Sequence, residues 1–440
     1  MDASVVDPPA AVAAMEGSAR PGPAASGATR TVSYAGYEVT VPADWPVYRL
    51  DTDPARCVRY DIHAVYLGTP GTDQQCPAGL IGRTETVSII AAPAGAQGAI
   101  RGDAAAHALT AAGTAGASVV ATYGADPALI RQVLGTLRPA PAGTAVTGTQ
   151  ATGARALGPR AAAGQATGAR ASVPRPAVIQ PAVTQPTTIQ WHGLPSSWPT
   201  AIVETAPVPP ARRPLPGFDA CTAPSLPTMK AWRQGYAVAG IYIGGVNAAC
   251  DLGNLSAAWI RSAAAMGWSM LPTYVGPQAP CTRYGNLIMP TRAAGEGSAA
   301  ADDAVRDAST LGLPTGSPIY YDMEGYAGGP SCTAAVLAFL GAWTRQLTTR
   351  GYVSGVYSSR DSGIADMQAA AVARRAGFTP PQAVWTALWD GQATLGTGSP
   401  PWPLTERNKQ YVGPHDMTIG GFTLSIDTDL VGGPVFSGRA

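Results

Sequence analysis

The stretch SPIYYDMEGY, residues 317–326, decides how the rest of the sequence is interpreted. It begins as an apolar run suited to a buried strand and ends with two carboxylates, Asp322 and Glu324, one residue apart. Because side chains alternate along a strand, these two carboxylates point to the same face. Burial of two like charges is costly, so such a pair belongs at a strand end, near solvent and other polar groups. That position suits catalytic acids, and the alternative is that the pair only makes hydrogen bonds at the strand end.

Short apolar runs alternate with helix-like stretches on both sides of this segment. VAGIYIGG precedes LSAAWIRSAAAMG, SMLPTYVG precedes GSAAADDAVRDASTLG, and CTAAVLAFLGAWTRQLTTRG follows the acidic pair. Such alternation predicts right-handed parallel βαβ units, and about eight strands in roughly 225 residues fit a (β/α)8 TIM-like barrel. We expect its last units to be degraded, because AVWTALWD, KQYVG and FTLSIDTDLV have little helix between them. A doubly wound open sheet is the alternative, but no GxGxxG motif or P-loop follows the first strand.

Composition divides the chain into four parts. Residues 1–30 are rich in Ala, Gly and Pro and are predicted to be disordered. Residues 31–140 contain the strand-like runs VSYAGYEVTVP, WPVYRLD, HAVYLGT and ETVSIIAAP and the helical run DPALIRQVLGTLRP, which predict a small α+β domain of unknown role. Residues 141–205 are rich in Pro, Ala, Gly and Thr and predict a linker. The barrel is expected over 206–440, as a domain that folds independently of the first.

Charge and composition exclude several classes of function. Charged residues make up 13% of the chain and the net charge is +1, so no basic field favours nucleic acid. No apolar run approaches the roughly 20 residues that span a bilayer. The N-terminal stretch has neither a basic n-region nor an apolar h-region, so no signal peptide is visible. We expect a monomer that uses no cofactor.

The chain has six cysteines, an even number, and none forms a CxxC motif. With no nearby His to complete a zinc set, no metal site is expected. Scattered, even-numbered cysteines favour disulfides, and therefore a secreted or cell-envelope protein; six buried free thiols are the alternative. Proximity of neighbouring loops favours one set of pairs over the other connectivities. These pairs are Cys57–Cys76, Cys221–Cys250 and Cys281–Cys332.

The carboxyl ends of the predicted barrel strands, where the chemistry of such barrels lies, carry acids ringed by aromatic residues. Paired carboxylates cleave glycosidic bonds, and aromatic faces stack on sugar rings. A glutamate in a partly apolar cleft has a raised pKa, which suits Glu324 to the role of general acid and Asp322 to that of its charged partner. Trp385 and Trp389 taken alone are more typical of core packing. The residues expected at the site are Asp219, Asp322, Glu324, Asp427 and Asp429, with Tyr242, Tyr274, Tyr357, Trp385, Trp389, Gln410 and Tyr411.

Five motifs in order carry a family resemblance: GFDAC at 217–221, YDMEGY at 321–326, WTALWDG at 385–391, KQYVG at 409–413 and IDTDL at 426–430. Together they resemble the glycoside-hydrolase-like barrel domain known as domain of unknown function 1906, over about residues 215–440. That domain is in turn similar to the family 25 lysozymes. The resemblance implies cleavage of peptidoglycan between N-acetylmuramic acid and N-acetylglucosamine. It implies Asp219, Asp322, Glu324 and Asp427 as the catalytic residues, while Cys221 departs from the lysozymes, in which a serine often follows the first aspartate.

Three functions are compatible with these observations. The first is an exported glycoside hydrolase acting on cell-wall polysaccharide or peptidoglycan. The second is a catalytically weak or inactive carbohydrate-binding barrel used in cell-envelope maintenance. The third is an interaction protein that uses the N-terminal domain, but no sequence motif supports this function. The paired carboxylates favour the enzyme, because a pure binding module has no need of them.

Overall fold

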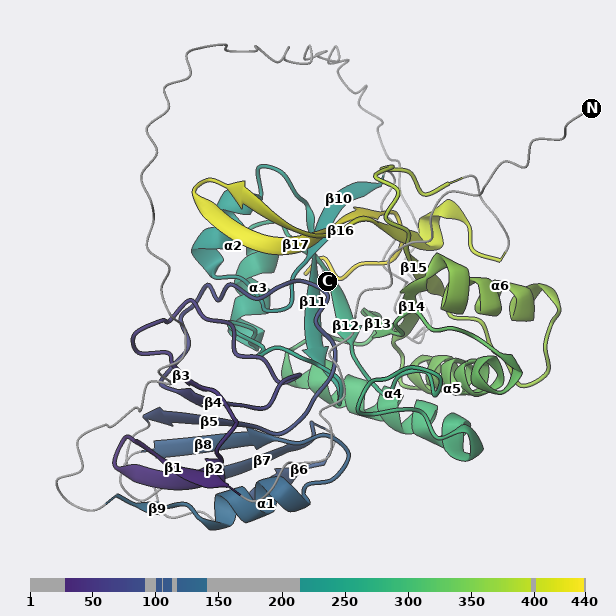
Figure 1. Cartoon of the computed structure of the whole chain (residues 1–440). Helices are drawn as coiled ribbons and strands as arrows, with labels where there is room; N and C mark the ends of the chain where they lie inside the picture. The colour runs from purple at the N-terminus through teal and green to yellow at the C-terminus, as the bar shows by residue number, and fades with distance from the viewer. Residues whose placement is uncertain are drawn as a thin grey trace, which may run out of the picture. The chain divides into compact units, whose positions relative to one another are not determined.

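The structure, a computed structural model, describes residues 28–91, 100–104, 106–112, 117–140, 214–396 and 401–438. The predicted linker at 141–205 lies outside the described residues, as do the first 27 residues of the chain. The described chain comprises an N-terminal region of two sheets and a closed barrel of strands β10 to β17 (Figure 1). The closed barrel agrees with the predicted architecture and excludes the open-sheet alternative.

Seven parallel strands and one antiparallel strand close the barrel. Helices follow the first five strands and lie on the outside of the barrel (Figure 1). The strands are β10 (Leu215–Asp219), β11 (Val238–Gly244), β12 (Ser269–Tyr274), β13 (Pro318–Asp322), β14 (Val353–Ser359), β15 (Ala383–Ala387), β16 (Arg407–Ile419) and β17 (Phe422–Val431). The α-helices are α2 (Leu226–Trp232), α3 (Ala257–Ala265), α4 (Ala293–Thr310), α5 (Pro330–Thr349) and α6 (Ala365–Val372).

The last two strands depart from the repeated parallel unit. A parallel crossover needs a dozen or more residues, whereas only Gly420 and Gly421 connect β16 to β17. Both glycines have positive φ, 60° and 85°, which matches the tight turns that join antiparallel strands. Strand β17 therefore runs back along β16 and pairs antiparallel with β10, and this pairing closes the barrel.

Local sequence explains where the first helices begin and how they pack. Ser225 and Ser256 are the N-caps of α2 and α3, and each side chain accepts a hydrogen bond from a backbone N–H of the first turn. Large aromatic side chains then fill the layer between the helices and the barrel; Trp232, Trp268 and Trp343 are fully buried there.

The N-terminal region is richer in strands than the sequence pattern indicated. The run VSYAGYEVTVP, predicted as one strand, forms a hairpin, because Ala35 and Gly36 both have positive φ and turn the chain. Helix α1 (Ala128–Gly135) matches the predicted helical run and buries Ile130, Val133 and Leu134. One sheet contains β1 (Thr29–Tyr34), β2 (Tyr37–Pro42) and β9 (Arg138–Pro139). The other contains, in spatial order, β3 (Val47–Arg49), β4 (Ala64–Leu67), β5 (Thr86–Ala91), β8 (Ala117–Thr122), β7 (Ala108–Ala112) and β6 (Arg101–Asp103).

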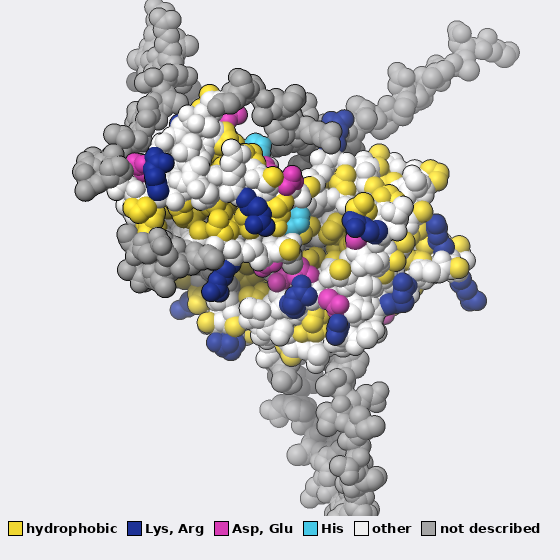
Figure 2. Space-filling model, turned by 90° about the horizontal axis from the view of Figure 1, so that it is seen from below, with side chains coloured by type: hydrophobic (Ala, Val, Ile, Leu, Met, Phe, Trp, Pro, Cys, Tyr) yellow, Lys and Arg dark blue, Asp and Glu magenta, His cyan; other side chains and the backbone are white. Residues whose placement is uncertain are grey.

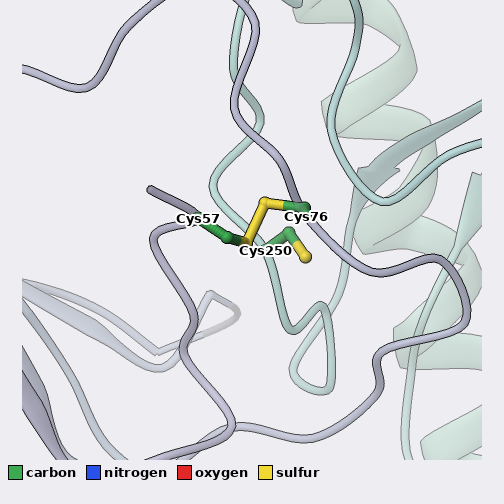
Figure 3. Close-up of side chains that lie close together, drawn as sticks. All are labelled: Cys57, Cys76 and Cys250. Atoms are coloured by element: carbon green, nitrogen blue, oxygen red, sulfur yellow. A yellow bond between two sulfur atoms is a disulfide. The ribbon is translucent and has the colours of Figure 1, made fainter. Parts of the chain in front are cut away.

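The six cysteines form the three predicted pairs, Cys57–Cys76, Cys221–Cys250 and Cys281–Cys332. The first two bridges come from different regions of the chain yet are buried together in one cluster. The sulfur atoms of Cys57, Cys76 and Cys250 all lie within 4.8 Å of one another (Figure 3). The N-terminal region is therefore packed against the barrel at this point, a contact that the sequence pattern did not indicate.

No helix among the described residues is long and apolar enough to cross a membrane. Lys and Arg side chains are spread singly over the face shown in Figure 2 and form no basic patch there.

Helix α4 offers a test of the packing around the barrel. A Cβ at Gly297 would lie 2.2 Å from the backbone oxygen of Phe339 on α5, whereas a Cβ at Gly295 would meet nothing within 4 Å. Gly297→Ala should lower the free energy of unfolding by about 1–3 kcal/mol through overpacking. Gly295→Ala should raise it by about 0.5–1 kcal/mol, because alanine favours a helix over glycine. Urea denaturation measures both, and equal stability of the two variants would contradict the close contact of α4 with α5.

Candidate active site

Five carboxyl groups meet at the carboxyl end of the barrel. Asp219 and Asp322 end β10 and β13, Asp427 and Asp429 lie two residues apart on β17, and Glu324 follows β13 in a loop. Asp427 is the register partner of Asp219. The four aspartates are 0–2% exposed, whereas Glu324 is partly exposed. The structure thus brings together all five acids that the sequence analysis named.

Gln410 on β16 connects the acids to the surrounding aromatic residues. Its Nε2 donates to Asp219 Oδ2 at 3.0 Å, and the Tyr242 hydroxyl donates to Asp219 Oδ1 at 3.3 Å. Its Oε1 accepts from the Tyr357 hydroxyl at 2.9 Å and from Trp389 Nε1 at 2.8 Å. These donors hold Asp219 in place and stabilise its ionised form.

The two expected tryptophans have different positions. Trp389 is 49% exposed, and its indole lies on Gly413, where a Cβ would come within 2.7 Å of the ring. Trp385 is 2% exposed and packs edge-on against Tyr357, with ring centroids 5.1 Å apart. Its Nε1 donates to Asp429 Oδ1 at 2.9 Å. Trp389 therefore offers a free aromatic face, and Trp385 supports Asp429 from the barrel interior.

Tyr274 does not join the site. Its hydroxyl donates to Asp303 on α4 at 2.6 Å, and its ring stacks on Trp343 of α5 with centroids 5.8 Å apart. Tyr274 therefore lies in the layer between the barrel and the helices, and these contacts do not support the substrate-binding role expected for it. Tyr411 follows Gln410 on β16 and is half-buried. Burial and the charge of Asp429 raise the pKa of Tyr411.

Two residues in the loop after β12 belong to the site and were missed from the sequence. Gln278 is fully buried; its Oε1 accepts from the Glu324 backbone N–H at 2.8 Å, and its Nε2 donates to the Asp322 carbonyl oxygen at 2.7 Å. It therefore fixes the loop that carries Glu324. Burial, and then the charges of Glu324 and Asp322, raise the pKa of Tyr284, so Tyr284 is close enough to interact electrostatically with both acids. In the sequence, the only signal for Gln278 and Tyr284 was that both are polar residues in a loop that follows a predicted barrel strand.

Burial is the largest influence on every carboxyl pKa in the group. It raises the pKa of Glu324 to about 7 and, with the charges of Asp219 and Glu324, that of Asp427 to about 9. It also raises the pKa of Asp429 and of Asp322 well above the ordinary aspartate value. Burial raises the pKa of Asp219 too, but the hydrogen bonds that Asp219 accepts oppose this effect.

The expected roles of the opening pair change accordingly. We expected Asp322 to stay ionised, but burial and the neighbouring carboxylates favour its protonated form. Besides burial, the neighbouring Glu324 raises the pKa of Asp322, whereas Asp322 lowers that of Glu324. Asp219, with donors on both oxygens, is better placed to carry negative charge.

Three buried carboxylate oxygens have no hydrogen-bond partner within the described part of the chain: Asp322 Oδ1, Asp427 Oδ1 and Asp429 Oδ2. Buried polar atoms are almost always paired, and exceptions concentrate at sites of function. Three such atoms in one group are typical of a binding or catalytic site.

The described residues contain one group of side chains spaced as metal ligands, Cys57, Cys76 and Cys250 (Figure 3). Their sulfurs are all engaged in disulfides, so none is a free thiolate that could bind a metal.

The raised pKa values predict how stability varies with pH. A carboxyl whose folded pKa lies above its unfolded pKa binds a proton on folding, so stability falls as pH rises between the two values. For Asp427 this window runs from about 4, its ordinary value, to about 9. Asp427→Asn should therefore reduce the loss of stability with pH in that window by up to about 1.4 kcal/mol per pH unit. Denaturation at pH 5, 6.5 and 8 measures the slope; Asp416→Asn, on the same hairpin, is the control, and an unchanged slope in Asp427→Asn would refute protonation of Asp427 in the folded state.

Residues 230–431 match the family model described as the Rv2525c-like, glycoside hydrolase-like domain. Asp322, Glu324 and Asp427 lie inside the matched range, and Asp219 precedes it. None of the curated proteins compared with the chain matches it.

Several solved structures are similar to half of the chain. An uncharacterized protein of B. stearothermophilus is 21% identical, with 49% of this chain and 95% of that chain covered and a TM-score of 0.36. The Mycobacterium tuberculosis Tat-secreted protein Rv2525c, in complex with L-tartrate, is 17% identical, with 50% and 96% covered and a TM-score of 0.33. The modular autolysin LytC of Streptococcus pneumoniae is 12% identical, with 49% and 46% covered and a TM-score of 0.35. By this match, residues 230–431 of the chain are similar to the Rv2525c-like, glycoside hydrolase-like domain.

Proposed function

We propose that the barrel is a glycoside hydrolase acting on cell-wall glycan, with Glu324 as the general acid. The observation that carries the proposal is the state of Glu324: of the five grouped acids it is the one that is partly exposed, and its pKa is raised to about 7. A carboxyl group with such a pKa holds a transferable proton at neutral pH and can reach a ligand.

The neighbouring groups support a division of roles. Asp322, whose pKa burial raises well above the ordinary aspartate value, would stand protonated beside Glu324 and help to orient it. When Glu324 protonates the glycosidic oxygen, positive charge develops at the anomeric carbon, and the ionised Asp219 would stabilise it. Asp427 and Asp429, protonated and buried, would supply hydrogen bonds rather than charge.

The substrate class follows from the aromatic surface and the family. The exposed indole face of Trp389 lies next to Gln410, which contacts the acid group, and is suited to stacking on a sugar ring. The glycoside hydrolase-like family description agrees with a sugar substrate. Resemblance to the lysozymes favours peptidoglycan, cut between N-acetylmuramic acid and N-acetylglucosamine. Three disulfides support an extracellular location.

One observation favours a second candidate, a carbohydrate-binding barrel with weak or no turnover. Asp219, Asp322 and Asp427 are each no more than 2% exposed, so Glu324 is the acid that a ligand reaches first. A barrel in which the remaining acids only shape the pocket would bind glycan without cutting it.

Glu324→Gln tests the enzyme directly. It keeps the size and much of the hydrogen bonding of the side chain but removes the transferable proton, which should slow cleavage by about 10²- to 10⁴-fold. Release of muropeptides and new reducing ends from purified sacculi is the measurement, with Glu406→Gln, in the short helix before β16, as the control. For the unchanged enzyme, kcat/KM should fall above about pH 7, as Glu324 loses its proton. A wild-type rate in Glu324→Gln would remove Glu324 from this role, and absence of turnover in the unchanged protein would favour the binding barrel.

Trp389→Ala tests the sugar platform in either case. Loss of the exposed indole face should weaken binding of an N-acetylglucosamine oligomer about tenfold. Leu404→Ala is the matched control, since Leu404 is a comparably exposed apolar side chain at 45%. Calorimetric titration gives both affinities, and equal affinities of the two variants would exclude Trp389 from the sugar site.

A further inference from the structure

Residues 72–84 of the N-terminal region, which we call the N-terminal wall, run across the acid-bearing end of the barrel. At the start of the wall, Asp73 Oδ1 accepts from the Ser225 backbone N–H at 3.0 Å and from the Thr228 hydroxyl at 2.9 Å. The Thr72 carbonyl oxygen accepts from Asn254 Nδ2 at 2.6 Å. These contacts attach the wall to the loops that follow β10 and β11.

The middle of the wall lies next to the acids. The Ala78 backbone N–H donates to Ser425 Oγ at 3.3 Å, on β17 two residues before Asp427. A Cβ at Gly79 would lie 3.8 Å from Asp427 Oδ2 and 3.6 Å from Pro414 of β16. The N-terminal region therefore passes close beside a carboxyl group of the candidate active site.

The end of the wall pairs with the loop after β11. The Gly82 backbone N–H donates to the Asn247 carbonyl oxygen at 2.9 Å, and Ile81 forms a bridge with Ala248. The Arg83 guanidinium donates to the Ala248 carbonyl oxygen from Nη2 at 2.8 Å and from Nε at 3.2 Å. Main-chain pairing and the hydrogen bonds of a half-buried arginine make this a firm attachment.

The neighbouring contacts make the wall a fixed part of the site. The adjoining disulfides Cys57–Cys76 and Cys221–Cys250 are buried against each other beside it (Figure 3). Gln74 Nε2 donates to Asp251 Oδ2 at 3.3 Å. The wall thus covers the barrel mouth over β17 and the loops after β10 and β11. On the loops after β13 and β15, Glu324 is partly exposed and Trp389 is 49% exposed.

We propose that the N-terminal wall closes one end of the cleft, so that the site takes the terminal sugars of a glycan chain rather than an internal stretch. Cleavage or binding inside a chain needs room for sugars on both sides of the acid. Within the site Glu324 is partly exposed and Trp389 is exposed, whereas the wall stands beside Asp427. This inference rests on the proposed function, because it concerns how glycan enters the same site.

Binding of end-blocked oligomers tests the closed cleft. The full chain carrying Glu324→Gln is titrated with a long β-1,4-linked N-acetylglucosamine oligomer that is free, capped at its reducing end, or capped at its non-reducing end with a bulky group. We expect one cap to weaken binding at least tenfold and the other to have little effect. Equal affinity for all three ligands would overturn the closed cleft and leave the proposed function intact. If no oligomer or muropeptide binds, the proposed function fails as well.

Release of the wall tests its part in that selectivity. Asp73→Ala with Arg83→Ala, added to Glu324→Gln, removes the side chains that attach both ends of the wall. The capped oligomer that was excluded should then bind within about threefold of the free one. Asp53→Ala with Arg56→Ala is the matched control, since this ion pair of the same region is exposed. Circular dichroism checks that the triple variant is folded. A folded triple variant that still excludes the capped oligomer would overturn the role of the wall. If the triple variant unfolds, the titration of the Glu324→Gln chain with capped oligomers tests the proposal by itself.

Discussion

The burial of five carboxyl groups close together at one end of a barrel is the constraint on which the rest of the site depends. Two charges a few ångströms apart in a medium of low dielectric constant repel by several kcal/mol, so the five cannot all be ionised. The neighbouring cation does not relieve this, because Lys409 Nζ is bound to Asp390 at 2.7 Å. Gln410, the next residue on β16, faces the acids instead and supplies hydrogen bonds without charge. The protein thus accommodates the acids by retaining protons, and retained protons are what a general acid needs.

The alternation of strands and helices could be predicted from the sequence because it depends on local patterns. The acids at strand ends could be predicted for the same reason: Asp219 and Asp322 each close an apolar run, and the parallel topology brings such ends together. Asp427 instead lies in the middle of the antiparallel strand β17 and reaches the site through its register with Asp219. The position of Tyr274 shows where prediction from strand ends fails. A barrel strand is buried on both faces, so polarity does not tell an inward residue from an outward one. Tyr242 and Tyr274 occupy similar places near strand ends, yet one reaches Asp219 and the other Asp303.

Contacts between distant segments were the part that could not be predicted. Gln278 acts through the backbone of Glu324 and Asp322, and no spacing rule joins a loop glutamine to a strand forty residues further on. The N-terminal wall meets the barrel largely through main-chain groups, such as the Gly82 N–H and the carbonyl oxygen of Ala248. Main-chain pairing leaves little trace in side-chain identity, so composition suggested independent domains where the structure shows a shared surface.

That shared surface links the N-terminal region to the chemistry of the barrel. Asp427 is 2% exposed, with Gly79 of the wall beside it, and burial is the main reason why its pKa is raised. Glu324 in turn raises the pKa of Asp427 through its charge, as Asp219 does. A wall that excludes water from Asp427 therefore keeps that group neutral, and a neutral Asp427 adds no repulsion to an ionised Asp219. The same residues that limit how a glycan enters would also help to decide which carboxyl groups hold protons when it arrives.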